Sequence, residues 1–162
     1  PVTLIEYAAH SCEVCARFNA DILPGLKKDY IDKGKLLYVF RLWPLKPSDG
    51  AAEKIARCLP PSAYFPFLDL LFRNQNIWNG SRDPYAGLVR LARRMGLTAA
   101  RVDHCIGDTT QDADINRIDA QGEAKYQVAG IPALVINGAA LPSGIPDGNK
   151  LKALVDAALA RK

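Results

Sequence analysis

Two cysteines three residues apart, directly after a strand-like run, constrain this chain more than any other feature. The apolar run over residues 2–7 has the composition of a β-strand, and Cys12-Glu13-Val14-Cys15 follows it. A helical pattern begins at about Cys12. A sulfur at a helix N-terminus lies near free backbone N–H groups and the positive end of the helix dipole, and both favour the thiolate. The order of strand, CxxC and helix therefore predicts a redox site.

The same cysteine spacing can also bind a metal or arise by chance. The chain has no second CxxC and no HxxxH, and a zinc site would need two more ligands where only His10 and His104 exist. A soft ion such as Cu(I), held by Cys12, Cys15 and His10, stays an alternative. We prefer redox chemistry, in which Cys12 attacks and Cys15, one helical turn later, resolves a mixed disulfide.

Composition sets the broad class. The chain has 162 residues, of which 49% are hydrophobic, so it can build one cored domain or a small domain with an insertion, and disorder is not expected. The net charge is +4, and the densest basic group, Arg90, Arg93 and Arg94, is not interleaved with aromatic residues. We interpret that group as a solvated helix face and expect no nucleic-acid partner. No apolar run is long enough to span a membrane.

The first third of the chain reads as one βαβ unit. A helix over residues 12–33, kinked by Pro24 and ended by Gly34, joins the first strand to a second strand over residues 36–42. A strand, helix and strand at this spacing are normally parallel and right-handed. The sequence therefore predicts an α/β fold.

The middle of the chain predicts helices only. Ser48 or Asp49 can cap one that runs through Cys58, and Thr98 caps another that includes Cys105. Five aromatic side chains are expected to build the core of this helical insertion: Tyr64, Phe65, Phe67, Phe72 and Tyr85. A return helix, a strand, a hairpin turn and a last helix follow, at about 110–127, 133–136, 137–138 and 151–159.

This order of elements resembles the DsbA-like branch of the thioredoxin superfamily over nearly the whole chain. The CxxC stands where the family has its active disulfide, and Glu6 stands where the family often has a buried acid. Gly130-Ile131-Pro132 stands where the family has its cis-proline loop. Residues 40–44, followed by two alanines, resemble the family's path into its helical insertion.

The resemblance implies how the chain divides into domains. A thioredoxin-like domain would comprise residues 1–47 and 117–162, and an inserted α-helical domain would comprise residues 48–116. The resemblance also implies a cis bond before Pro132, with a backbone edge at Ile131 to which an extended substrate could pair as a strand. Without the resemblance, Pro132 would read as an ordinary proline that opens an edge strand.

Glu6 is the expected acid–base residue. On a strand beneath the helix it would point inward, its pKa would be raised by burial, and it could exchange protons with Cys15. Arg41, on the next strand, is a candidate charge partner for Glu6. The alternative is that both side chains reach solvent at a strand edge.

The residues around Cys12 decide how oxidising the site is. His10 could favour the thiolate as an imidazolium, or it could be an exposed loop histidine. Many DsbA-like oxidases have a histidine where this chain has Val14, and the acidic Glu13 disfavours a neighbouring thiolate. We therefore predict a higher Cys12 pKa and a lower reduction potential than in a strongly oxidising DsbA. These three residues, with Ile131 and Pro132, are the expected substrate contacts.

Cys58 and Cys105 fall on separate helices of the insertion. We expect them to form a structural disulfide, which would restrict the unfolded chain; two buried free thiols are the alternative. A second, non-catalytic disulfide also occurs in some DsbA-like proteins. The even count of four cysteines favours export to an oxidising compartment.

The sequence and the resemblance together predict a periplasmic or otherwise exported thiol:disulfide oxidoreductase with no bound cofactor or metal. A disulfide oxidase acting on unfolded or reduced exported proteins, and reoxidised by a membrane partner, is preferred over an isomerase or reductase. The chain carries no signal peptide, and a mature exported protein would look the same. Because the family's isomerases oligomerise through an N-terminal extension and this chain begins at the fold, we expect a monomer.

Overall fold

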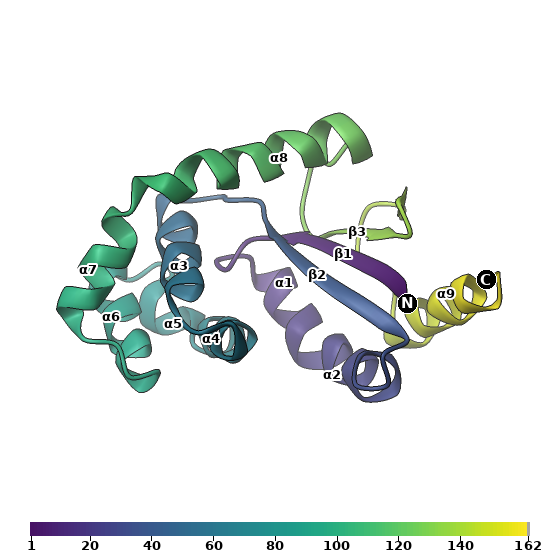
Figure 1. The fold of residues 1–162 in the computed structure, drawn as a ribbon, viewed down its shortest axis with the longest axis horizontal. Helices are drawn as coiled ribbons and strands as arrows, with labels where there is room; N and C mark the ends of the chain where they lie inside the picture. Colours follow the sequence, from purple (N-terminus) through teal and green to yellow (C-terminus); the bar gives the residue numbers. More distant parts are fainter. Residues whose placement is uncertain (162) are drawn as a thin grey trace.

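The computed structural model describes residues 1–161, and a four-stranded sheet forms its centre (Figure 1). The strands are β1 (Val2–Ala8), β2 (Leu36–Leu42), β3 (Ala133–Ile136) and β4 (Ala139–Ala140), in the order β2-β1-β3-β4. β1 and β2 are parallel, and β3 is antiparallel to both β1 and β4. The predicted α/β class, its βαβ unit and its hairpin are confirmed.

The helical segment after β1 is less regular than predicted. It consists of α1 (Glu13–Arg17), the π-helical η1 (Phe18–Ile22), α2 (Leu23–Leu26) and the π-helical η2 (Lys27–Ile31). Pro24 lies in the first turn of α2, directly after a π turn. Proline has no N–H to donate to the preceding turn, so the wide π turn stands where an α-helical bond would be missing.

Five helices form the insertion, on the left of Figure 1: α3 (Pro47–Cys58), α4 (Pro61–Arg73), α5 (Gln75–Trp78), α6 (Pro84–Arg94) and α7 (Ala99–Gly107). The prediction that Ser48 or Asp49 caps α3 is wrong. Lys46 is the extended N-cap residue, and the carboxylate of Asp49 accepts its N–H at 2.9 Å from the third helical position. Thr98 caps α7 as predicted, by accepting the N–H of Arg101.

The chain returns to the sheet through α8 (Asp112–Tyr126), which follows a short 3-10 turn (Thr109–Gln111), and it ends in α9 (Gly148–Ala160). α8 runs without a break through the expected domain boundary after residue 116, and the division into domains stays a prediction. Within residues 1–161, no helix combines the length and the hydropathy that a membrane crossing requires.

The two faces of the sheet are covered by different helices. α8 lies along one face, while the α1–α2 segment and α9 lie on the other (Figure 1). Tyr7 and Val135 share a buried cluster on the α8 side, where a Cβ on Gly122 would come within 2.6 Å of the Tyr7 ring. Leu4 packs with Phe18 on the opposite side. Because side chains alternate along a strand, Glu6 shares the face of Leu4, beneath the α1 segment.

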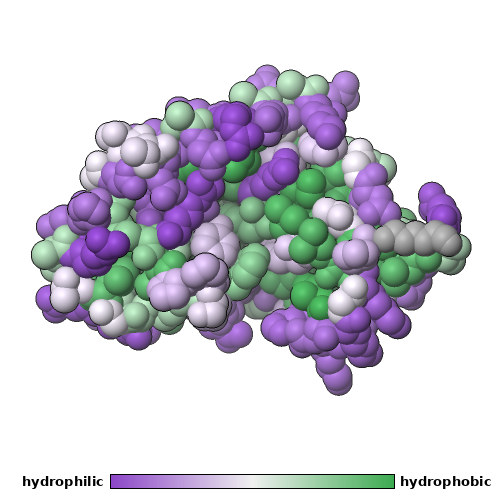
Figure 2. All heavy atoms as spheres, viewed as in Figure 1, coloured by the Kyte–Doolittle hydropathy of each residue, from purple (hydrophilic) through white to green (hydrophobic). Residues whose placement is uncertain are grey.

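Some large apolar side chains stay exposed on the insertion and on the edge of the sheet. Phe67 and Phe72 are buried as predicted, but Phe65 and Tyr85 are 45% and 42% exposed, so the prediction that these two help to build the core of the insertion is wrong. Leu37, on the edge strand β2, is also exposed. On the face of the molecule shown in Figure 2, apolar residues gather in the middle, over the strands.

Candidate redox site

Cys12 and Cys15 form a disulfide at the start of α1. Cys12 is the extended N-cap residue, and its sulfur accepts the backbone N–H of Cys15 at 3.1 Å. Cys12 retains 8% exposure, whereas Cys15 is fully buried. A partner can therefore reach Cys12 more readily than Cys15, and the helix start offers a donor that stabilises negative charge on the Cys12 sulfur.

Side chains of the helical insertion hold the loop that precedes Cys12. The buried carboxylate of Asp49 accepts both the N–H and the hydroxyl of Ser11, at 2.8 and 2.9 Å. The amide of Gln75 donates to the carbonyl oxygens on either side of Ser11, at 2.9 and 3.1 Å. The amide of Asn79 donates to the carbonyl of Ser11 itself at 3.0 Å. The position of the redox loop thus depends on the insertion as well as on the sheet.

His10 is fully buried, so the alternative of an exposed loop histidine is wrong. Its ring stacks on Phe40 with centroids 5.2 Å apart, and Phe72 lies 6.0 Å away. Its Nε2 lies 2.9 Å from Oε2 of Glu53, on α3. Its Nδ1 is buried and has no hydrogen-bond partner. The histidine therefore reaches the insertion through one ring nitrogen and leaves the other free.

Glu53 is the acidic centre of this contact, and the sequence reasoning missed it. Burial alone would raise the pKa of Glu53, but its pairing with His10 and Arg57 outweighs burial and holds the pKa below its usual range. The Tyr64 hydroxyl also donates to it, at 2.9 Å. Arg57 in turn donates to Asp114 of α8, at 2.8 Å. A signal existed, because Asp49 and Glu53 lie four residues apart on one helix.

Glu6 is buried on the α1 side of the sheet, as expected. Burial raises its pKa to about 8, and a hydrogen bond from the Tyr38 hydroxyl, at 2.5 Å, lowers it only in part. Its second carboxyl oxygen has no partner. At neutral pH this carboxyl is therefore largely protonated and has one oxygen free to exchange a proton.

Arg41 is not the partner of Glu6, and that prediction is wrong. Arg41 pairs in register with Tyr7, donates to the Tyr7 hydroxyl at 2.9 Å and lies 5.8 Å from the centre of the ring. Successive residues of a strand point to opposite faces, so Arg41 shares the α8 face with Tyr7. Tyr38 contacts Glu6 instead. It lies on the same face of β2 as Phe40, the residue that pairs in register with Glu6.

A groove lies beside the disulfide. The Ile131–Pro132 peptide bond is cis, as the family resemblance implies, and the ladder between β3 and β1 begins one residue later, at Ala133. Val14 and residues 126–135, with parts of the following loop, line a groove of about 380 Å³. The structure thus brings Val14, Ile131 and Pro132 together. The other two expected substrate contacts do not line the groove: His10 is buried, and the Glu13 side chain is 83% exposed beside Arg17.

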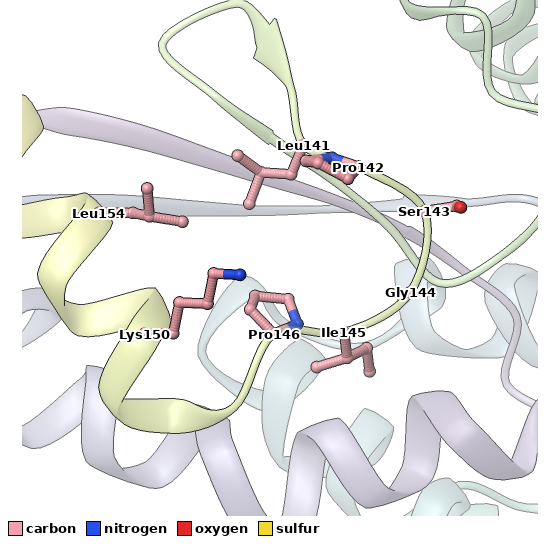
Figure 3. A pocket seen from close by; sticks show the side chains of 8 residues that line it. All are labelled: Leu141, Pro142, Ser143, Gly144, Ile145, Pro146, Lys150 and Leu154. Atoms are coloured by element: carbon pink, nitrogen blue, oxygen red, sulfur yellow. The ribbon is translucent and has the colours of Figure 1, made fainter.

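A smaller cavity continues this groove towards α9. It has a volume of about 190 Å³, and Leu141, Ser143 and Gly144 line both spaces. Figure 3 shows Leu141, Lys150 and Leu154 arranged around it, with the Ser143 hydroxyl turned away. The groove therefore extends along an apolar wall that carries one cation.

The second disulfide joins Cys58 of α3 to Cys105 of α7, across 47 residues of sequence. The two sulfurs are thus bonded in the structure rather than free, and the structural role of this disulfide stays a prediction. Among the residues that the structure describes, no cysteine is free and no three His, Cys, Asp or Glu side chains gather as a metal site.

Comparisons with known proteins agree with this geometry. A family model described as Thioredoxin matches residues 1–157. The chain is 27% identical over 139 residues to a Rickettsia typhi protein named "Putative protein-disulfide oxidoreductase RT0103", covering 85% of this chain and 51% of that one. The chain spans about half the length of the rickettsial relatives it matches.

Solved structures share the fold over almost the whole chain. The crystal structure of Wolbachia pipientis alpha-DsbA1 matches with a TM-score of 0.88 and 25% identity, covering 99% of this chain and 87% of that one. The crystal structure of oxidised BdbD from Bacillus subtilis matches with a TM-score of 0.85 and 21% identity, covering 99% and 88%. At this identity the second match supports the fold alone.

Proposed function

Because this chain belongs to the thioredoxin family and is DsbA-like, we propose that it is a thiol:disulfide oxidoreductase that oxidises thiols of exported proteins. The observation that carries the proposal is the unequal setting of the two bonded sulfurs. Cys12 is the more exposed and lies at a helix N-terminus, while Cys15 is fully buried behind it. Such a setting favours attack at Cys12 and protects Cys15 from a second substrate.

In the oxidase direction, a substrate thiolate attacks the Cys12 sulfur and the Cys12–Cys15 bond breaks. Cys15 leaves as a thiolate and takes a proton. A second substrate thiolate then attacks the substrate's own sulfur in the mixed disulfide, and Cys12 leaves as a thiolate. The N–H of Cys15, 3.1 Å from the Cys12 sulfur, supports that charge. A membrane partner would reoxidise the two cysteines, and no bound cofactor takes part.

Glu6 is the proposed proton donor to Cys15. Its raised pKa, about 8, keeps a proton available at neutral pH, and its unpartnered oxygen lies on the sheet face beneath α1. In the reverse direction the carboxylate would accept the Cys15 proton, so that Cys15 can attack a mixed disulfide. The same group therefore serves either direction of electron flow.

The cis-proline groove is the proposed substrate site. Ile131 precedes the β3 ladder, so an extended polypeptide could add to its backbone while side chains enter the groove beside Val14. This mode recognises an unfolded main chain rather than one sequence. Reduced, unfolded exported proteins are the substrate class that it suits.

A refolding assay tests the direction of electron flow. The oxidised protein, at stoichiometric amounts, should oxidise a reduced, unfolded secreted protein faster than glutathione disulfide alone does. Strong reactivation of a scrambled ribonuclease without added oxidant would favour an isomerase and overturn the oxidase proposal. Tight, stoichiometric Cu(I) binding without turnover on thiols would favour a soft-metal module, although His10 Nε2 is already bonded to Glu53.

A further inference from the structure

We propose that His10 and Glu53 form a positioning pair that takes up one proton when the Cys12–Cys15 disulfide is reduced, and so keeps Cys12 a thiolate. The proposal deepens the redox function above and rests on it. Two observations carry it: His10 lies two residues before Cys12 in the same anchored loop, and it is a buried base with one nitrogen paired and the other free.

The paired nitrogen has a fixed role. Glu53 is ionised because the hydrogen bonds from His10 and Arg57 outweigh its burial, and an ionised carboxylate can only accept. Nε2 of His10 must therefore carry the hydrogen in the 2.9 Å contact. Proton uptake by this ring can only occur at Nδ1.

The surroundings of His10 leave Nδ1 for a partner that appears later. Phe40 and Phe72 flank the ring, and the charged or titratable groups about its carboxylate partner are Arg57 and Tyr64. None of these hydrogen-bonds Nδ1. A buried polar atom without a partner is uncommon and calls for an explanation. Reduction creates a thiolate at Cys12 in the same loop, which is an acceptor that the disulfide does not provide.

The protons and electrons balance in the oxidase direction. The substrate's two thiols lose two electrons and two protons and become a disulfide. The electrons break the Cys12–Cys15 bond and leave two sulfur anions. One proton reaches Cys15, by way of Glu6, and the other goes to Nδ1 of His10 rather than to the Cys12 sulfur. The reduced site then holds a Cys12 thiolate and, two residues before it, a histidine cation whose other ring nitrogen is bonded to Glu53.

The pair also accounts for a gap in the motif. Neither Glu13 nor Val14 offers a positive charge to Cys12. A cation at His10, two residues before Cys12 and fully buried, would supply that charge with little screening by solvent. The insertion thereby takes part in the redox chemistry, since Glu53 belongs to α3.

The histidine proton can be observed directly, because the chain has two histidines and His104 lies on α7, next to Cys105 of the other disulfide. We expect the imidazole ¹⁵N shifts of His10, in the wild-type protein at pH 7, to change from the neutral to the cationic pattern when Cys12–Cys15 is reduced and Cys58–Cys105 stays intact, while those of His104 stay constant. A His10 signal that keeps one protonation state in both redox forms would overturn the proposal.

Thiolate titration gives the second test. His10→Phe keeps an aromatic ring between Phe40 and Phe72, and Glu53→Gln removes the charge with little change of shape. Both variants should raise the Cys12 pKa by at least about one unit. If that rise changes the redox equilibrium tenfold, the reduction potential of the disulfide shifts by 29.6 mV. Ser11→Ala is the matched control, since it removes one hydrogen bond of the same loop without touching the pair.

An unchanged Cys12 pKa in both variants, or an equal rise in Ser11→Ala, would assign His10 a purely structural role. Both measurements need only the reduced and oxidised protein, not turnover. If the protein fails to oxidise substrate thiols while His10 still takes up a proton on reduction, the proposed function fails and the role of the His10–Glu53 pair stands. If the protein oxidises substrate thiols while His10 takes up no proton, the proposed function stands and the role of the pair fails.

Discussion

Two disulfides lie in this chain, one at the start of α1 and one between α3 and α7. Cys12–Cys15 closes a loop of three residues, which hardly restricts the unfolded chain, whereas Cys58–Cys105 closes one of 47. Around the first lie a buried acid with a raised pKa, a buried histidine–glutamate pair and a groove. The second links two helices of the insertion. Under the proposed function, the surroundings of each disulfide, rather than the bond itself, would separate the reactive disulfide from the structural one.

Removal of one cysteine of the first disulfide should have the largest effect on the difference between the two disulfides. Cys12→Ala should reduce the oxidation of substrate thiols to the rate without protein, because the other sulfur of the motif, Cys15, is fully buried. Its fold should persist, since the lost loop is short. Substrate oxidation by the purified variant, beside circular dichroism, measures both. Retained turnover would mean that Cys12 is not the attacked sulfur.

The matched change at the second disulfide should have the opposite profile. Cys58→Ala together with Cys105→Ala should lower the free energy of unfolding by about 4 kcal/mol, from loop entropy alone, and leave the oxidation rate per folded molecule nearly unchanged. Urea unfolding and the same thiol assay report the two effects. A variant that unfolds like wild type but loses turnover would place the reactive bond in the insertion.

Glu6 distinguishes the two disulfides by its proton. The folded protein holds this proton more tightly than the unfolded chain, because burial raises the pKa from 4.5 to about 8. Its contribution to stability is complete below pH 4.5 and falls by about 1.4 kcal/mol per pH unit as the pH rises towards 8. Glu6→Gln should remove this slope. Urea unfolding of both proteins across that range measures the difference, and parallel profiles would contradict a buried, protonated Glu6.

Tyr38 gives the smallest of these effects. Tyr38→Phe removes the hydroxyl that donates to Glu6, so the Glu6 pKa should rise further and the folded protein should lose about 1 kcal/mol at pH 8, where the carboxylate forms. Tyr30→Phe is the control, because its hydroxyl is bonded to Asp156 and not to Glu6. A change in the Glu6 titration that is equal in both variants would mean that Tyr38 has no specific role.

The sequence predicted what local pattern and cysteine chemistry determine. Strand β2 was predicted at its observed bounds, the Asn137-Gly138 turn joins β3 to β4 through two left-handed residues, and both disulfides pair as expected. Each of these depends on neighbouring residues or on the few cysteines available. The position of Glu6 followed from the family resemblance together with its place on a buried strand.

The contacts that no local pattern contains were missed. Arg41 was assigned to Glu6 because both lie on neighbouring strands, and only the register, Tyr7 opposite Arg41, places it on the other face. The burial of His10 depends on how α3 docks against the redox loop, which brings Glu53 to it across 43 residues. Such a contact arises only from tertiary packing, so the sequence pattern showed that Glu53 lies on a helix but not that it contacts His10.

The proposed attack at Cys12 can be tested by finding which disulfide a substrate thiol opens. The oxidised protein would be mixed with a limiting amount of a reduced, unfolded protein, quenched with acid, alkylated and mapped by mass spectrometry. We expect a mixed disulfide at Cys12, an alkylated Cys15, and an intact Cys58–Cys105 bond. Opening of Cys58–Cys105 first, or a mixed disulfide at Cys15, would contradict this expectation.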